Sequence, residues 1–312
     1  MSLGEDGPVS ARDVQPARAP ERLFGSLFRF GSSRPAKALR RDKLAAASLA
    51  VLLVIILSAA FAPWLTPYPE QGAGAPNITE KLEPPSLAHP FGTDQLGRDV
   101  LARVLYGGRT SLLAAFSIVL IALLSGTVLG AIAGYAGGWV DETIMRITDI
   151  FLAFPPLLLA ITIAAVLEPT LTNTILAVAL TWWPWYTRIA RGQAVSLRER
   201  AFVQAAQGLG ARDGRIISQH ILPNLMTPVL VQATLDLGTA IMTVTGLSFL
   251  GIGVQPPTAD WGVMVSEGRL FVQSGVWWLA TFAGLLIFVS TLAFNLLGDS
   301  IQIILNPRTN SP

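Results

Sequence analysis

Long uncharged runs recur along this chain of 312 residues. A helix that crosses the hydrocarbon core of a bilayer needs about 20 consecutive apolar residues, and six stretches come close to that length. Inside a bilayer the backbone must satisfy its own hydrogen bonds, so each stretch is expected to be a helix. The sequence therefore predicts an all-α integral membrane protein with six transmembrane helices. The expected spans are 44–62, 110–140 with an end near 135, 150–167 extended backward to 144, 169–187, 221–245 and 270–298.

The composition indicates a protein whose solvent is lipid. Hydrophobic residues make up 52% of the chain and charged residues only 13%, whereas a soluble domain carries about 25% charged residues. A net charge of +2 is too small to indicate a nucleic-acid partner. The absence of cysteine excludes disulfides and Cys-ligated metal. The two histidines, His89 and His220, are far apart in sequence, so a histidine-based zinc site is not expected.

The distribution of positive charge predicts the orientation. An even number of spans places both termini on the same side of the membrane. If that side is the cytoplasm, seventeen of the 22 Lys and Arg residues fall in inner segments and five in outer segments. Inner loops carry the excess of positive charge, so we expect both termini in the cytoplasm. Residues 188–220 then lie in the cytoplasm as well.

The segments outside the spans complete the expected domain organisation. The first twenty or so residues of a 1–36 cytoplasmic leader are expected to be disordered. Residues 22–30 fit either a short amphipathic helix on the membrane surface or an unstructured tail. The further divisions are a first transmembrane helix within 37–66, an extracytoplasmic loop at 67–109, a core of five transmembrane helices at 110–300 and a cytoplasmic tail at 301–312.

The extracytoplasmic loop should contain an interfacial helix that leads into the second span. Residues 99–105 have helical spacing, with Val100 and Val104 among the apolar residues on one side. Arg98, Arg103 and Arg109 would then face headgroups or water.

Motifs of nucleotide hydrolysis and acyl transfer are missing. A phosphate-binding loop needs a Lys directly after a Gly, and none of the three lysines, Lys37, Lys43 and Lys81, has that neighbour. No GxSxG nucleophile motif occurs. We therefore expect neither catalysis nor a bound cofactor on this chain.

Ionisable residues within apolar stretches are candidates for a solute path. Arg146 and Asp149 are three residues apart and are expected to form an ion pair within one helix. Asp236 interrupts the fifth span, where its carboxylate could either hydrogen-bond a neighbouring helix or line an aqueous path. The candidate path residues are Asp149, Asp236 and Thr239.

Residues 198–223 form a charged, helix-prone insert between the fourth and fifth spans. In a helix, Phe202, Ala205, Ala206 and Leu209 share one face. Gly210 suits the left-handed conformation that ends a helix, and Pro223 suits the first turn of the fifth span. These signals predict a short cytoplasmic helix–turn–helix. The alternative is an amphipathic loop that lies on the membrane surface.

Several motifs then carry a resemblance to a known family. The stretch QAAQGLGARDGRIISQHILP resembles the cytoplasmic-loop signature of ABC importer permeases, although Gln204 replaces an acidic residue and His220 replaces Ile. The stretches HPFGTDQLGRDVLARVLYGGRTSL, GYAGGWVDETIMRITDIFLAFP, RGQAVSLRER and TGLSFLGIGVQPPTADWGVMVSEGR resemble the dipeptide/oligopeptide/nickel subfamily, in particular its C-type subunit. The resemblance covers roughly residues 37–307.

The resemblance implies a type I importer in a bacterial inner membrane. The chain would pair with a second, homologous permease, while two cytoplasmic ATPases bind ATP and Mg²⁺ and an extracytoplasmic solute-binding protein delivers the solute. The 198–220 segment would be the coupling helix that docks on an ATPase. The residues implied in coupling are Glu199, Phe202, Gln204, Ala205, Ala206, Gly208, Leu209, Gly210, Leu222 and Pro223.

The expected function is therefore ATP-driven import of di- and oligopeptides. Nickel chelates or another small solute remain an alternative cargo for the same architecture. A self-sufficient secondary carrier or channel, and a membrane-bound scaffold or enzyme, are alternatives of other classes. A proton-coupled carrier would be expected to show more intramembrane charges and an internal repeat, and no such repeat is evident.

Overall fold

The computed structural model describes residues 42–305, and the secondary structure of this part is helical. The expected leader at 1–36, including its 22–30 stretch, lies outside the described residues, as does the end of the tail. The elements are α2 (Lys43–Ala60), α3 (Ala62–Leu65), α4 (Pro69–Gly72), η1 (Ile78–Glu80), α5 (Val100–Ala136), α6 (Gly138–Leu152), α7 (Pro156–Val166), α8 (Leu171–Arg198), α9 (Ala201–Gly208), α10 (Asp213–Ile216), η2 (Ile217–Ile221), α11 (Leu222–Phe249), α12 (Trp261–Gly268), η3 (Arg269–Ser274) and α13 (Trp278–Leu305).

Four helical segments of the described part are long and apolar enough to cross a membrane. They are 43–60, 100–136, 213–249 and 278–304, and a fifth span is added if the bent pair α6–α7 is counted as one. The expected fourth span, α8, is not among them. Although α8 has 28 residues, its second half carries Arg188, Arg191 and Arg198. The structure thus has an all-helical membrane architecture with four or five candidate spans.

The expected third span is not one straight helix. Helices α6 and α7 meet at an angle of 85° across a short break. The break contains Pro155, which disfavours helical torsions at the preceding Phe154. Pro156 then starts α7, where its missing N–H is not needed. Hydropathy alone could not reveal this bend, because the uncharged run from residue 150 to 166 continues across the break.

The second span is longer than expected and includes the expected interfacial helix. Helix α5 has 37 residues, which corresponds to about 55 Å at about 1.5 Å per residue. The Asp99 side chain accepts a hydrogen bond from the Ala102 N–H at 2.7 Å and so caps the start of the helix. Residues 99–105 are therefore the first turns of α5 and not a separate helix.

Two arginines expected to face water are buried instead. Arg98 and Arg103 are 0% and 1% exposed, and both contact Asp94, at 2.7 and 2.8 Å. Arg103 also contacts Glu267 of α12 at 2.8 Å. Arg109 is exposed as expected and lies over the ring of Tyr106. The buried ions tie the 67–99 segment to α5 and α12.

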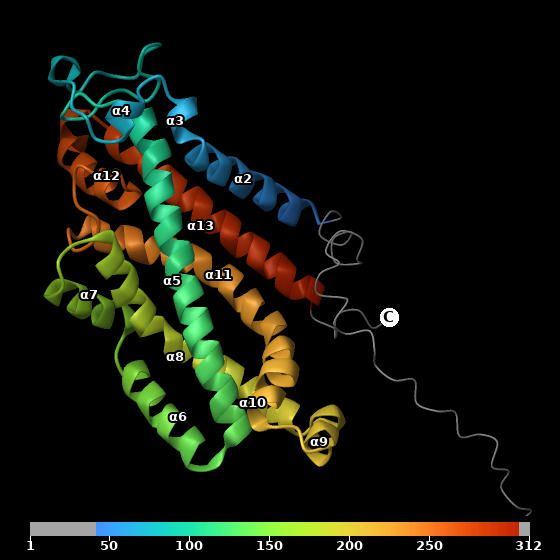
Figure 1. The fold of residues 1–312 in the computed structure, drawn as a ribbon. Coiled ribbons are helices and arrows are strands. Elements are labelled where there is room, and N and C mark those ends of the chain that lie inside the picture. Colours follow the sequence, from blue (N-terminus) through green and yellow to red (C-terminus); the bar gives the residue numbers. More distant parts are fainter. Residues whose placement is uncertain (1–41, 306–312) are drawn as a thin grey trace, which may run out of the picture.

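Figure 1 shows that the molecule has two different ends, joined by α5. The loop before α5, with α3, α4 and the nearby α12, lies at one end, and α9 and α10 lie at the other. Helices α2 and α13 pack together. Ser300, near the end of α13, hydrogen-bonds the carboxylate of Asp42, which precedes α2, and this hydrogen bond lowers the pKa of Asp42. The start of α2 and the end of α13 are therefore adjacent.

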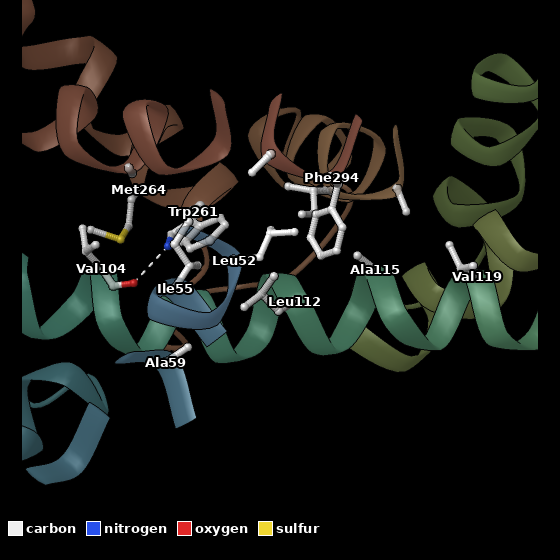
Figure 2. Packing of buried hydrophobic residues seen from close by; sticks show 14 of the residues in the cluster. Leu52, Ile55, Ala59, Val104, Leu112, Ala115, Val119, Trp261, Met264 and Phe294 are labelled. Atoms are coloured by element: carbon white, nitrogen blue, oxygen red, sulfur yellow. Dashed lines mark hydrogen bonds between the residues drawn. The ribbon is translucent and has the colours of Figure 1, made fainter. Parts of the chain in front are cut away.

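The buried core near the first end is built around Trp261 (Figure 2). Trp261 is fully buried, and its indole N–H donates to the Val104 carbonyl at 2.9 Å. Leu52 and Ile55 of α2 belong to the same cluster. Gly108 allows this close packing, since a β-carbon there would lie 3.1 Å from the indole ring. The core thus joins α2, α5, α12 and α13.

Helices α5 and α8 form the most extensive helix pair. Gly126, Gly130 and Gly134 of α5 face the α8 backbone at a spacing of four residues. A β-carbon at Gly134 would lie 2.6 Å from the Arg191 carbonyl oxygen, and β-carbons at the other two would overlap carbonyls one and two turns earlier. Small residues at this spacing let membrane helices approach closely. This packing places α8, the expected fourth span, against α5, the second span.

Candidate coupling segment and translocation hollow

The polar insert folds into a helix, a turn and a second helix, as its spacing predicts. Helix α8 ends at Arg198, and the eight-residue α9 begins at Ala201. Gly210 adopts a φ of +78°, a left-handed conformation that is strained for residues with a β-carbon. Its N–H donates to the Gln207 carbonyl at 2.9 Å and so closes the turn. The chain then enters α10.

Pro223 lies in the first turn of α11, as expected, but the helix does not begin there. Helix α10 continues through η2, a π-helical turn, into α11, so that 213–249 is one helical segment. A proline inside a helix clashes with the carbonyl four residues earlier. The wider turn immediately before Pro223 relieves that clash, because it moves the preceding carbonyls outward. The second helix of the 198–223 segment is therefore continuous with the membrane helix.

Helix α9 is attached to the rest of the protein through Val203. This side chain is fully buried in a cluster with Tyr135 of α5, Ala194 of α8 and Ile216 of α10. Val203 is not among the residues expected to take part in coupling, although Ala206, three residues on, lies on the same side of the helix. Ala206 is half-buried against this cluster and so does not share the exposed side of Phe202, with which its helical spacing grouped it.

The opposite side of α9 is open to solvent. Phe202 is 40% exposed and Leu209 is 89% exposed. Ala205 and Gly208 are exposed too. The structure thus leaves two large apolar side chains and two small residues uncovered at the end of the molecule.

A polar network around Tyr135 fixes the segment to the end of α5. The Tyr135 hydroxyl donates to the Asp213 carboxylate at 2.9 Å and accepts from the Gln207 amide at 3.2 Å. The Arg198 guanidinium donates to the Tyr135 carbonyl at 3.1 Å. Tyr135 thus links the end of α5 to α8, α9 and α10 by hydrogen bonds. The sequence alone could not identify Tyr135, because its partners are more than sixty positions away.

A hollow of about 550 Å³ lies behind α9. On its wall, Arg191 of α8 donates two hydrogen bonds to the Asp141 carboxylate, at 2.5 and 2.6 Å. Gln204, at the position where the resembled signature has an acid, faces this hollow together with Glu199. The lining residues are Gly134, Gly137, Asp141, Arg191, Val195, Arg198, Glu199, Gln204 and Gln207.

A second hollow, here called the Asp236 hollow, has a volume of about 360 Å³ and lies between α8, α11 and the bend of α6–α7. Asp236 and Thr239, both expected path residues, are part of its wall. The Asp236 carboxylate accepts hydrogen bonds from Tyr186 at 2.6 Å and from Gln232 at 2.9 Å. It therefore both bonds a neighbouring helix and lines a hollow. The lining residues are Leu152, Pro156, Leu157, Thr181, Trp182, Trp185, Tyr186, Asp236, Thr239 and Thr243.

The expected ion pair between Arg146 and Asp149 is wrong. Asp149 instead accepts from Arg188 of α8 at 2.7 Å, and Arg146 contacts Glu142 one turn away, at 3.4 Å. The bend after α6 brings α6 beside α8, which supplies a closer guanidinium than the neighbour on the same helix. Asp149 does not line the Asp236 hollow. Within 42–305 no group of three or more acidic or His residues is placed to hold a metal ion.

Comparison with known proteins identifies the family. Residues 126–311 match the family described as the binding-protein-dependent transport system inner membrane component. This chain belongs to that family. Residues 36–85 also match the N-terminal TM domain of oligopeptide transport permease C. The predicted resemblance is thereby confirmed.

Curated relatives cover nearly the whole of this inner membrane component. A dipeptide transport system permease protein, DppC, of Alkalihalophilus pseudofirmus is 46% identical over 88% of this chain and 89% of its own length. A probable D,D-dipeptide transport system permease of Escherichia coli is 42% identical over 90% and 93%. A di/tripeptide permease of Pseudomonas aeruginosa is 40% identical over 96% and 98%.

A solved structure supports the fold of this inner membrane component. The MetNI methionine ABC transporter in an inward-facing conformation matches with a TM-score of 0.51 at 15% identity, over 65% of this chain and 97% of that chain. The chain thus has the fold of an ABC transporter permease. Family membership makes it a multi-pass inner membrane permease subunit and not an enzyme.

Proposed function

We propose that this permease forms, with a second homologous permease, the path by which di- and oligopeptides cross the inner membrane. The observation that carries the proposal is the 46% identity over 88% of the chain to a dipeptide permease. The match of residues 36–85 to an oligopeptide permease domain supports the same cargo. An extracytoplasmic solute-binding protein would deliver the peptide.

Two cytoplasmic ATPases, which carry the ATP and Mg²⁺, would drive transport through α9. The exposed side of this helix offers Phe202 and Leu209 to a groove, and Ala205 allows close approach of the partner. Burial of Val203 would let a push on α9 reach α5, α8 and α11. The residues proposed to take part in coupling are Glu199, Phe202, Gln204, Ala205, Ala206, Gly208, Leu209, Gly210, Leu222 and Pro223.

The proposed topology has six spans with both termini in the cytoplasm. The span that this topology adds to the five candidates is α8, whose 28 residues reach about 42 Å at about 1.5 Å per residue. Its arginines are compatible with a span because two of them pair with acids of α6, Asp141 and Asp149. The charge bias of the loops supports the orientation. It places α9 in the cytoplasm and the 67–99 segment outside.

The proposed translocation path includes the Asp236 hollow, with Asp236 and Thr239 on its wall. Asp149 lies one turn of α6 before the lining residue Leu152 and is proposed to face the same path. The bend between α6 and α7 borders the hollow, so a change in the bend would alter its width.

Reconstitution tests the proposed function. The permease is co-purified with the second permease and the ATPases encoded beside it, placed in proteoliposomes and supplied with the neighbouring binding protein. We expect uptake of alanyl-alanine that requires both ATP and the binding protein and that is stopped by vanadate. Uptake of a nickel chelate but of no peptide would show that the transported solute is a nickel chelate and not a peptide. Uptake by the chain alone without ATP would contradict an importer permease.

A further inference from the structure

A polar stripe runs along the membrane helix α11 where it borders the Asp236 hollow. Gln232, Asp236, Thr239 and Thr243 follow one another at spacings of four, three and four residues, so they share one side of the helix. Three of the four line the hollow, and Gln232 donates to the Asp236 carboxylate. Polar side chains inside a membrane face a cavity or another helix and mark solute paths.

Hydrogen-bond donors approach both oxygens of the Asp236 carboxylate. The Tyr186 hydroxyl bonds one oxygen and the Gln232 amide bonds the other. The Tyr186 side chain is fully buried, so this donor occupies a fixed position. In its ionised form this carboxylate would present a negative charge to the hollow.

No cation of the described part, residues 42–305, neutralises this charge. Two of the three acids of α6 contact an arginine of α8: Asp141 contacts Arg191, and Asp149 contacts Arg188. No Lys, Arg or His nitrogen of this part makes an ion pair with Asp236, and no other charged residue lines the hollow. An unpaired carboxylate in apolar surroundings is costly. The geometry therefore leaves a negative site that a cation from outside would complete.

The walls of the hollow suit an organic cation. Trp182 and Trp185 of α8 lie on the wall, Trp185 being 52% exposed. Tryptophan is the aromatic side chain that attracts cations most strongly. Thr239, one turn after Asp236, is exposed on the same wall and offers a hydroxyl. The volume of about 360 Å³ is that of a small-molecule site, which commonly starts near about 300 Å³.

We propose that Asp236 binds the protonated primary amine of the transported solute, with the indoles of Trp182 and Trp185 beside it. This inference rests on the proposed function and deepens it, because the solute it implies is the free amino terminus of a small peptide. The contact is transient. Two protein donors already share the carboxylate, and a transport site must bind weakly enough to release its solute.

The first test removes the charge but keeps the hydrogen bonds. In Asp236→Asn the amide oxygen still accepts from Tyr186, and the amide NH₂ faces the Gln232 oxygen. We expect ATP-driven uptake of alanyl-alanine to fall by about tenfold, the scale of a lost charge-assisted hydrogen bond, and Asp236→Glu to restore most of it. The control Glu142→Gln neutralises an exposed acid of α6 and should stay within about twofold. Wild-type uptake in the Asn variant would overturn the inference.

A second measurement separates binding from assembly. The complex without binding protein is placed in nanodiscs and titrated with alanyl-alanine or with its N-acetyl derivative, and tryptophan fluorescence is recorded. We expect a change with the free amine only, lost in Asp236→Asn and reduced in Trp185→Phe. An equal response to both peptides, or no response to either, would overturn ammonium recognition.

The two proposals fail in different ways. If wild-type proteoliposomes take up no peptide, the proposed function fails. If the wild type transports peptide and Asp236→Asn transports it equally well, only the amine site fails. Binding-protein-stimulated ATP hydrolysis, measured on each variant complex, should remain in Asp236→Asn. Its loss together with uptake would assign Asp236 a structural role and overturn the inference.

Discussion

At the scale of single residues, Gly210 shows how one backbone torsion can shape an interaction surface. Its φ of +78° lies in the region that favours glycine, and a β-carbon built there meets no atom within 4 Å. A side chain at this position therefore has space, and the cost of a substitution is backbone strain alone. The turn at Gly210 sets the angle between α9 and α10.

Gly210→Val is expected to weaken coupling between ATP hydrolysis and transport. A β-branched residue in the left-handed region costs about 1–2 kcal/mol or more, so the turn relaxes and α9 changes its angle. We expect fewer peptides transported per ATP hydrolysed, with both rates measured in the same proteoliposomes. Gly214→Ala is the matched control, because Gly214 is helical and also has no atom within 4 Å. An unchanged ratio in Gly210→Val would contradict the mechanical role of the turn.

The buried arginines show what a sequence cannot reveal at this scale. The turn at Gly210 is a local preference and was predictable. The burial of Arg98 and Arg103 depends on Asp94 and on Glu267, which is more than 160 residues from Arg103. Arginines in a loop outside the membrane are expected to be solvated. Here the acids that pair with them come together with them only when the chain folds.

At the scale of helices, the pairing of α5 with α8 depends on three glycines. Gly126, Gly130 and Gly134 recur every four residues. This spacing is visible in the sequence and is typical of closely packed membrane helices. Gly130 is the central one, and a β-carbon there would overlap the Thr187 carbonyl of α8. The interface between α5 and α8 therefore has no space for a larger side chain at this point.

Gly130→Ala should destabilise the permease, although alanine is the better helix former. The added methyl group forces α5 and α8 apart, and overpacking of this kind costs about 1–3 kcal/mol. The matched control is Gly192→Ala on α8, where a β-carbon meets nothing within 4 Å. It should be neutral or stabilising by about 1 kcal/mol. Thermal unfolding of the two purified variants measures the difference, and equal melting temperatures would contradict the close packing.

Some helix boundaries carry a local signal, a cap or a proline, although the predicted spans did not follow it, and other boundaries carry none. The start of α5 at Asp99 and the break at Pro155 have such local signals. The merging of the interfacial turns into α5, and of α10 into α11 through a π-helical turn, have none. In both cases tertiary packing extends a helix past the point where the apolar run stops.

At the scale of the whole molecule, the two ends are built for different tasks. The end that contains α12 is braced by buried ions and by Trp261. The end that contains α9 leaves Phe202 and Leu209 uncovered. The family and the helical architecture could be read from motifs and hydropathy. The Asp236 hollow could not, because it combines residues of four helices, α6, α7, α8 and α11.

The absence of cysteine from the chain makes the proposed topology directly testable. Two positions are each replaced by a single cysteine: Leu87, fully exposed in the segment before α5, and Glu142, whose side chain is 69% exposed near the start of α6. With both termini in the cytoplasm, a membrane-impermeant maleimide should label Leu87→Cys in intact spheroplasts and Glu142→Cys only after permeabilisation. The unmodified chain should stay unlabelled and so sets the background. The reverse pattern would invert the topology, place α9 outside the cytoplasm and remove the basis for ATPase docking.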